Sequence, residues 1–442
     1  MNKRTFLKSA VTLASTAFMP SFSWPPLSNK KQLRTAHIGV GGMGLEDLKA
    51  ISSHNSVEVI ALCDVDSNHL NFAKGIYPNA KTFSDYRILF ETIGDQIDAV
   101  IVSTPDHTHA PASLMAMDIG KAVYCQKPLT HHISEARDMA QMAEKKQLVT
   151  QMGIQVHSFY DYKLATLLIQ SGIIGKVNCV RAWSPKNWGY DGPSPNSFDP
   201  IPSNLDWNLW LGTAKNQKFK EGIYHPGNWR KLVDYGCGTL GDMGVHIFDT
   251  PYNALMLDVP KTVKNECREP NGYGFPEKNK VTYIFPPTKY TSNELKWVWY
   301  DGVGAPSEHA DLQLPNNEKL HDQGAMFMGE KGRLYLPHFQ KLPQLIIDGK
   351  YKEINVEKFG LGKPVRDYSS ESKKHYHEFV DSCLGKGVCS APFSYSSKLT
   401  ETILLGVIAG RFPGKTLNWN KNKSQFSENK ANEFIGGNYR SF

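Results

Sequence analysis

The sequence predicts an α/β protein with two domains, a doubly wound parallel sheet followed by an α+β domain with one large sheet. Three observations predict this fold class. Short apolar strands alternate with helices up to about residue 155, which is typical of a parallel sheet covered on both faces. Strand-like runs then follow one another, flanked by helices, which indicates an α+β domain. The chain of 442 residues also exceeds the size of a single core, about 250–300 residues.

The expected elements follow from these patterns in chain order. In the first part, strands are expected at 35–40, 57–63, 98–103, 122–125 and 148–152, and helices at 45–51 and 134–146. In the second part, helices are expected at 160–170, 240–257, 372–384 and 396–410, and strands at 176–183, 280–285, 295–300, 325–328, 333–336 and 344–347. The sequence thus predicts one domain over 32–155, a second over 156–417 and an extended polar tail over 418–442.

Residues 1–31 have the features of an export signal and a linker. Lys3, Arg4 and Lys8 accompany an apolar run over 10–18, which is shorter than the roughly 20 residues needed to cross a bilayer. The segment resembles a twin-arginine signal in which Lys3 replaces the first arginine. The general secretory route and a disordered basic N-terminus are the alternatives. We expect an exported, periplasmic protein whose mature form has no membrane span.

Composition excludes several other classes. The net charge is +7, of which the signal supplies three charges, and the remainder is too scattered to indicate a nucleic-acid partner. The seven cysteines include no CxxC pair, so neither a disulfide scaffold nor a zinc ribbon is expected.

A glycine-rich motif predicts a dinucleotide site. G-V-G-G-M-G follows the first strand and opens a helix, where glycines allow a tight turn and close approach of a pyrophosphate. Asp64 ends the second strand, twenty residues after Gly44, and would accept hydrogen bonds from the ribose hydroxyls. A carboxylate there repels a 2′-phosphate, so NAD is favoured over NADP. The cofactor-binding residues expected here are Gly39, Gly41, Gly42, Met43, Gly44 and Asp64.

Two further motifs follow strands at the same edge of the predicted sheet. S-T-P-D-H-T-H supplies further expected cofactor contacts from Ser103, Thr104, Pro105, His107 and His109. Thr104 or Asp106 could also cap the next helix, and capping is compatible with cofactor contact.

In C-Q-K-P-L, Pro128 restricts Lys127 to an extended backbone, and this lysine would lie partly buried near the nicotinamide. Such a lysine could hydrogen-bond a substrate hydroxyl. Taken alone, the motif favours a solvated loop lysine.

The segment G-D-M-G-V-H-I-F-D carries a candidate proton-transfer group. Asp242, His246 and Asp249 stand at i, i+4 and i+7, so a regular helix would place them on one face. A histidine can take a hydroxyl proton near neutral pH, and a carboxylate can orient it. In one alternative Asp242 caps the helix and His246 lies in the core. A metal at Asp242 and His246 is another, but no third ligand is evident, so no metal is expected.

An aromatic-rich stretch over 183–229 suits a sugar site, because aromatic faces stack on the C–H faces of sugar rings. D-W-N-L-W-L-G (206–212) is expected to be packing. Domain packing is the alternative for the whole stretch. The residues expected to line a sugar site are Lys186, Tyr190, Trp229 and Arg230.

The ordered set GVGGMG, CDVD, STPDHTH, CQKP and GDMGVHIFD resembles the Gfo/Idh/MocA oxidoreductase family over roughly residues 34–415. The resemblance implies an N-terminal Rossmann domain, a C-terminal domain with an open, mostly antiparallel sheet, and a homo-oligomer, dimer or tetramer. It implies NAD(P)-dependent oxidation or reduction of a secondary alcohol of a sugar or cyclitol.

The resemblance also implies roles for particular residues. The family's E-K-P lysine falls on Lys127, with Gln126 in place of the glutamate, and its Asp-x3-His pair falls on Asp242 and His246. Gln155 and His157 depart from the commoner pattern. We expect Gln126 and Gln155 to contact the cofactor and His157 the substrate.

Together these features predict an exported, NAD-dependent oxidoreductase acting on a sugar or glycoside, with position C3 favoured. His246 would move the hydroxyl proton, Lys127 would position the oxygen and Asp242 would orient either one. NAD would travel inside the folded protein during export. Two alternatives stay open: a redox-neutral glycoside hydrolase that passes through a 3-keto intermediate and elimination, and a non-catalytic sugar-binding protein.

Overall fold

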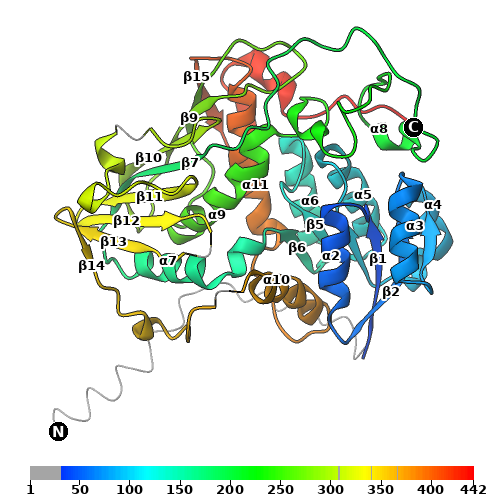
Figure 1. Ribbon diagram of the computed structural model, residues 1–442, viewed down its shortest axis with the longest axis horizontal. Helices are drawn as coiled ribbons and strands as arrows, with labels where there is room; N and C mark the ends of the chain where they lie inside the picture. The colour runs from blue at the N-terminus through cyan, green and yellow to red at the C-terminus, as the bar shows by residue number, and fades with distance from the viewer. Residues whose placement is uncertain (1–30, 307–308, 340, 366) are drawn as a thin grey trace.

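The computed structural model describes residues 31–306, 309–339, 341–365 and 367–442. The expected export signal lies outside the described residues. Figure 1 shows the two sheets at opposite sides of the molecule, with helices between and around them.

The first sheet has six parallel strands in the order β3-β2-β1-β4-β5-β6. Its strands are β1 (Leu33–Ile38), β2 (Val57–Cys63), β3 (Lys81–Phe83), β4 (Ala99–Val102), β5 (Ala122–Gln126) and β6 (Thr150–Gly153). The helices between them are α2 (Met43–Ser52), α3 (Ser67–Ile76), α4 (Tyr86–Ile93), α5 (Asp106–Asp118) and α6 (Ile133–Lys146). The strand order reverses between β1 and β4, which opens a crevice at the carboxyl edge of the sheet. This is the predicted doubly wound Rossmann sheet.

The second sheet has ten strands in the order β14-β13-β12-β11-β7-β10-β9-β8-β15-β16. Only β7 and β10 pair in parallel among these strands, so the sheet is mostly antiparallel as predicted. Its strands are β7 (Val177–Ser184), β8 (Thr262–Glu266), β9 (Asn279–Phe285), β10 (Thr291–Asp301), β11 (Gly324–Gly329), β12 (Gly332–Pro337), β13 (Gln344–Ile347), β14 (Lys350–Lys352), β15 (Thr416–Asn420) and β16 (Gln425–Phe426).

Four helices join the two sheets. Helices α9 (Val245–Ala254) and α11 (Phe393–Ala409) lie between the large sheet and the first domain, and α7 (Tyr160–Gln170) runs along the large sheet and packs against α9 (Figure 1). Helix α10 (Tyr368–Cys383) packs Tyr376, Phe379 and Val380 into a core that it shares with β1, β4 and β5 of the first domain. The late helices therefore return to the body, as the sequence predicts.

The aromatic stretch before α9 forms a small core of its own and lies against the first domain. Trp207, Trp210 and Tyr224 pack together there, around the short helix α8 (Trp207–Leu211). Two backbone hydrogen bonds attach this stretch to the end of β2, from Asp206 N to Val65 O (2.9 Å) and from Ser67 N to Asn204 O (2.8 Å). The expectation that residues 206–212 are packing agrees with this core.

The segment 418–442 differs from the expected extended tail. It contains the end of β15, the strand β16 and the 3₁₀ turn η8 (Asn429–Phe434), because Trp419 and Phe426 are buried and pair across β15 and β16. The remainder crosses back to the first domain.

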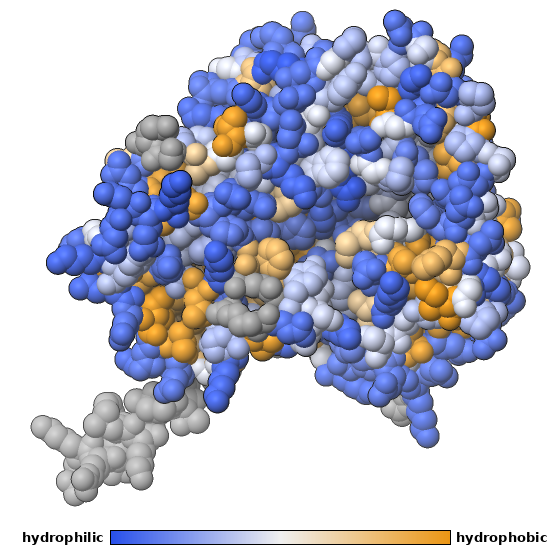
Figure 2. Space-filling view, in the orientation of Figure 1, coloured by the Kyte–Doolittle hydropathy of each residue, from blue (hydrophilic) through white to orange (hydrophobic). Residues whose placement is uncertain are grey.

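In Figure 2 the visible face is mostly hydrophilic, and its apolar side chains form separate patches. Among the described residues, no helix combines the length and apolar character needed to cross a membrane.

Candidate active site

The glycine turn between β1 and α2 is built to hold a phosphate. Gly39 and Gly42 have φ angles of +81° and +52°. A Cβ on Gly44 would lie 2.1 Å from the Gly39 carbonyl oxygen, whereas one on Gly42 would meet no heavy atom within 4 Å. No side chain caps the N-terminus of α2, and although the amides of Gly44 and Leu45 donate to Gly41 O (2.9 Å) and Gly42 O (3.2 Å), this positive end of the helix still favours an anion. The turn therefore fits a dinucleotide pyrophosphate.

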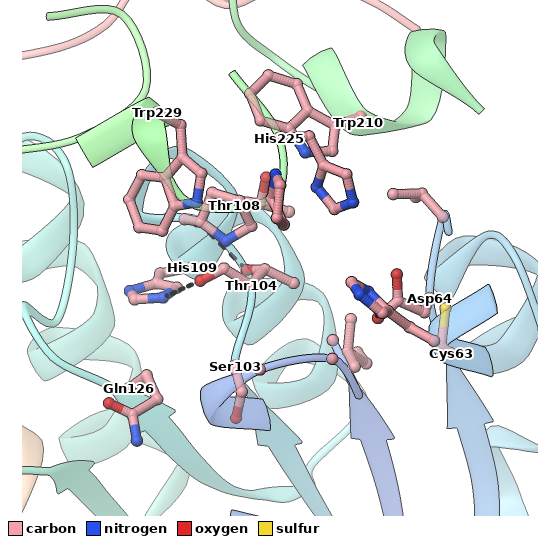
Figure 3. Close-up of a pocket in the computed structure, with 18 of the residues that line it drawn as sticks. Cys63, Asp64, Ser103, Thr104, Thr108, His109, Gln126, Trp210, His225 and Trp229 are labelled. Carbon is pink, nitrogen blue, oxygen red and sulfur yellow. Dashed lines mark hydrogen bonds and ion pairs between the residues drawn. The ribbon is translucent and has the colours of Figure 1, made fainter. Parts of the chain in front are cut away.

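A cavity of about 490 Å³ opens beside this turn. Figure 3 shows that Asp64, Ser103 and Thr104 reach it from the first domain, while Trp210, His225 and Trp229 cover it from the second. Of the expected site residues, those that line the cavity are Gly39, Gly41, Gly42, Met43, Asp64, Ser103, Thr104, Pro105, His109, Gln126, Lys127, Trp229 and Arg230.

Asp64 is fixed at the end of β2. Its carboxylate accepts hydrogen bonds from Val40 N (2.8 Å) and Asp66 N (2.9 Å). Burial raises the pKa of Asp64, and these amides oppose the shift. The held carboxylate fits the ribose end of NAD.

A buried polar network lies beneath the cavity, centred on Asp47 of α2. The Asp47 carboxylate accepts hydrogen bonds from Ser103 Oγ (2.6 Å), Gln126 Nε2 (2.8 and 2.9 Å) and Tyr376 Oη (2.7 Å). Burial raises the pKa of Asp47 to about 6 despite these donors. The amide at position 126 therefore serves as a donor to a buried carboxyl, which a glutamate could not do when ionised.

We predict that Gln126→Glu destabilises the protein by about 3–5 kcal/mol at neutral pH, since it places two carboxylates together in the interior. One proton can be shared at low pH, so the loss should be small below about pH 5 and grow as the pH rises through 6. Urea unfolding at several pH values measures this. Adding Asp47→Asn restores a carboxylate–amide pair and should recover most of the loss; no recovery would contradict this account.

Lys127 follows β5 and is held by a cluster of polar side chains from the second domain. Lys127 Nζ donates to Asp242 Oδ1 at 2.8 Å and to the Asp242 carbonyl oxygen at 3.2 Å, and the lysine side chain is 10% exposed. Asp242 also accepts from Arg230 Nε (3.1 Å) and Trp188 Nε1 (2.7 Å). Burial opposes ionisation of Asp242, but Lys127 and Arg230 outweigh it and lower its pKa. Lys127 is thus a fixed cation at the wall of the cavity.

Asp242, His246 and Asp249 do not form one group of side chains on a single helix face. Asp242 lies in a π-helical turn, η4 (Leu240–Gly244), and the other two residues lie in α9. The wider turn breaks the i, i+4 spacing of a regular helix. Asp249 instead accepts from His157 Nδ1 (2.9 Å) and Tyr395 Oη (2.7 Å), so it orients His157 and not His246.

His246 stays close to Lys127 without a carboxylate partner of its own. Burial and the charge on Lys127 lower its pKa well below the usual value. No partner is found for its buried Nδ1 within the described ranges. Asp242 was expected to orient either Lys127 or His246; its carboxylate accepts from Lys127, and no hydrogen bond to His246 is found among the described residues.

Several other expected residues lie away from the cavity. His107 Nε2 hydrogen-bonds the Trp210 carbonyl oxygen (3.0 Å), and Gln155 Nε2 donates to Tyr376 Oη (2.7 Å). Both side chains therefore form hydrogen bonds inside the protein. Gly44 is covered by the backbone of Gly39. The residues that do not line the cavity are Gly44, His107, Gln155, His157, Lys186, Tyr190, Asp242 and His246.

The sequence interpretation missed residues that line the cavity or its wall. Asp106 is buried in it, and burial raises its pKa to about 7. It does not cap α5, whose N-cap residue is Pro105. His225 reaches over the cavity and bonds Asp66 Oδ2 at 2.9 Å. No signal in the sequence joins His225 to Asp66, because they lie 159 residues apart.

Asp66, His69 and His225 are also near enough to one another to ligate a metal ion. The direct Asp66–His225 hydrogen bond already satisfies two of these groups. The absence of a metal stays a prediction.

The fold and the glycine turn define a Rossmann protein that binds a dinucleotide, and comparison with known proteins agrees. Residues 33–154 match the family model described as an oxidoreductase family with an NAD-binding Rossmann fold, and residues 163–274 match the C-terminal α/β domain of the same family. The chain belongs to the Gfo/Idh/MocA family of oxidoreductases.

Curated relatives include enzymes of sugar chemistry. A glycosyl hydrolase family 109 protein of Stenotrophomonas maltophilia is 34% identical over 137 residues, 28% of this chain and 29% of that protein. A levoglucosan dehydrogenase of Pseudarthrobacter phenanthrenivorans is 26% identical over 166 residues (38% and 34%). An inositol 2-dehydrogenase of Corynebacterium glutamicum is 26% identical over 153 residues (34% and 45%). The matched regions thus span less than half the length of these three relatives.

Solved structures share the fold over most of the chain. An oxidoreductase domain protein of Kribbella flavida is similar with a TM-score of 0.63, 19% identity and coverage of 88% of this chain and 100% of that one. A levoglucosan dehydrogenase in complex with NADH and L-sorbose has a TM-score of 0.62, 16% identity and coverage of 88% and 99%. At these identities the likeness shows the fold.

Proposed function

We propose that the protein is an exported NAD-dependent oxidoreductase that acts on a secondary hydroxyl of a sugar or glycoside, with C3 favoured. One observation carries the proposal: Lys127, a cation fixed by Asp242 at 2.8 Å, lines the same cavity as the glycine turn and Asp64. In this proposal Lys127 is the hydroxyl-binding group beside the dinucleotide site. The levoglucosan and inositol dehydrogenases among the relatives support the substrate class.

When bound, NAD would supply the acceptor for the hydride on the hydroxyl-bearing carbon. Gly39, Gly41, Gly42 and Asp64 would hold its phosphates and ribose. Lys127 Nζ would donate a hydrogen bond to the substrate oxygen and stabilise the negative charge that develops there. Arg230 and Trp188 support Asp242, which keeps Lys127 in position.

The hydroxyl proton needs an acceptor near Lys127. The expected acceptor, His246, is neutral, but its lowered pKa makes it a weak base and it does not line the cavity. Asp106 is a second acceptor, because it lines the cavity and has a pKa of about 7. A pH profile of single-turnover oxidation separates them: loss of an inflection near pH 7 in Asp106→Asn assigns it to Asp106.

The family 109 hydrolase relative favours one second candidate, a redox-neutral glycoside hydrolase. In that scheme C3 is oxidised to a ketone, which acidifies the C2 proton. Loss of this proton expels the aglycone, water adds at C1, and the ketone is reduced again. Deuterium from solvent that appears at C2 of the released sugar would support this candidate.

The decisive experiment is the near-ultraviolet spectrum of the purified protein with its own bound cofactor, before and after a panel of glycosides is added. A reduced-nicotinamide band that persists supports a dehydrogenase that awaits an acceptor. Glycoside cleavage without a lasting band supports the hydrolase. No change in sugar or cofactor with any glycoside would contradict both.

Export is proposed from the N-terminal segment. An exported protein that uses NAD would also need to retain its cofactor. Free NAD is scarce outside the cytoplasm, so a protein exported in the folded state would carry NAD with it. Release of stoichiometric NAD from the denatured, cell-exported protein supports this. Exported protein that contains no NAD would contradict it.

A further inference from the structure

We propose that Phe442 closes the adenosine end of the cofactor cavity and slows the release of bound NAD. This inference rests on the NAD binding that the proposed function requires, and it concerns retention of the cofactor, not the sugar chemistry. The group of NAD that Phe442 would contact is the planar purine ring.

The adenosine end is located by Asp64. Asp64 N donates to Phe83 O at 3.1 Å, so the next residues of the chain, 84–86, continue the cavity wall from Asp64. Phe442 lines the same cavity and contacts Arg87, the residue that follows this wall. Phe442 therefore lies beyond the ribose-binding carboxylate, where the adenine ring of a Rossmann-bound dinucleotide belongs.

The first domain holds the Phe442 ring in place through Arg87. The guanidinium carbon of Arg87 lies 4.1 Å from the ring centroid, and Arg87 Nη1 donates to the Phe442 backbone oxygen. Arg87 is itself fixed by Asp85, whose carboxylate accepts from its Nε and Nη2 at 2.7–3.0 Å. A cation over the ring and a backbone hydrogen bond fix both the position and the tilt of Phe442.

The second domain holds the same segment through Arg440. Its guanidinium donates to Asn208 Oδ1 (2.6 Å), Gly212 O (2.8 Å), Asn208 O (3.0 Å) and Ala214 O (3.1 Å), and its backbone N donates to Thr213 O (2.9 Å). Gly212 has a φ of +52°, and a Cβ there would stand 3.9 Å from Phe442 Cζ. The segment thus bridges both domains across one end of the cavity.

The Phe442 ring has the guanidinium carbons of Arg87 and Arg440 at 4.1 and 5.8 Å from its centroid, and the part of it that lines the cavity would give a purine an apolar contact, together with Tyr86 and Trp210 of the same cavity. NAD would have to leave past a ring that two arginines hold. Cofactor exchange should therefore be slow in the intact protein and should depend on Phe442 and Arg440.

The test measures exchange of bound NAD for isotopically labelled NAD in the purified holoprotein, followed by mass spectrometry of the retained cofactor. We expect Phe442→Ala to exchange roughly tenfold faster than the parent, the loss expected for one buried aromatic contact. Arg440→Ala should act in the same direction. Phe72→Ala is the matched control, because Phe72 is 61% exposed and does not line the cavity. Exchange in Phe442→Ala within twofold of the parent would overturn the proposal.

A second readout separates an adenosine contact from general loosening. Phe442→Ala should weaken binding of ADP-ribose, which has the adenosine part, and leave binding of nicotinamide mononucleotide, which lacks it, unchanged. Equal weakening of both would overturn the proposal. Failure of the proposed function looks different: Phe442→Ala would still release NAD faster, but no sugar would reduce the bound cofactor in any variant.

Discussion

Replacement of Lys127 by methionine is expected to lower the rate of sugar oxidation by roughly 10²–10⁴-fold. Methionine keeps an unbranched, partly buried side chain but removes the only group that donates from this position to a substrate oxygen. The single-turnover rate of cofactor reduction measures the effect, with bound NAD per chain as a check on the cofactor site. We expect NAD content to stay near that of the parent, because the glycine turn and Asp64 are untouched.

The same change has a structural cost that must be separated from catalysis. Asp242 would lose its contact with Lys127 at 2.8 Å and keep only Arg230 and Trp188, so we expect a loss of about 1–3 kcal/mol in unfolding free energy. Asp242 and Arg230 remain an ion pair in Lys127→Met, so this variant should stay folded at the assay temperature, and a rate loss well beyond the stability loss belongs to catalysis. If Lys127→Met keeps more than a tenth of the parent rate, Lys127 does not act on the substrate.

The second large effect is expected from Gly44→Ala, which should abolish copurification of NAD and lower the unfolding free energy by about 1–3 kcal/mol or more. The new Cβ would lie 2.1 Å from the carbonyl oxygen and 2.8 Å from the carbonyl carbon of Gly39. Both atoms belong to the backbone of the phosphate turn, so the start of α2 must move away. Cofactor content and urea unfolding measure the two effects.

Gly75→Ala is the matched control, since it also adds a methyl group to a helix of the first domain. No heavy atom lies within 4 Å of a Cβ there, so alanine should be neutral or stabilise α3 by up to about 1 kcal/mol. NAD content should not change. A Gly44→Ala protein that retains one NAD per chain would show that the turn tolerates the displacement.

Elements with strong local patterns are predicted well. The bounds are as expected for the strand Val57–Cys63, the helix Tyr160–Gln170 and the strand Gln344–Ile347. In each element the apolar residues form a run or a periodic pattern, because those positions are the ones that face the core. In the first domain β3, α3, α4 and the bounds of α5 were not expected, although α4 buries Tyr86, Leu89, Phe90 and Ile93. β3 has three residues and α3 buries only Ala73, so neither segment has a periodic pattern of apolar residues that would predict it.

The residues of the candidate site likewise fall into those that local sequence predicts and those that it does not. Gly39, Gly42 and Asp64 are predicted because backbone conformation and the spacing of β1, α2 and β2 are local properties. The partners of Gln126, Asp249 and Phe442 are not predicted, because each partner comes from a distant part of the chain.

The sequence by itself determined the order of elements and the dinucleotide turn, since these depend on apolar periodicity and on residues within a few positions of one another. The resemblance to the family, not the local pattern, singled out Lys127. Only the tertiary structure decided that Asp242 holds Lys127, that Asp249 holds His157 and that Phe442 reaches the cavity. A single π-helical turn sets Asp242 and Asp249 toward different partners. Such pairings depend on how the two domains close on each other, and hydrogen bonds across 92 to 355 residues leave no mark on local sequence.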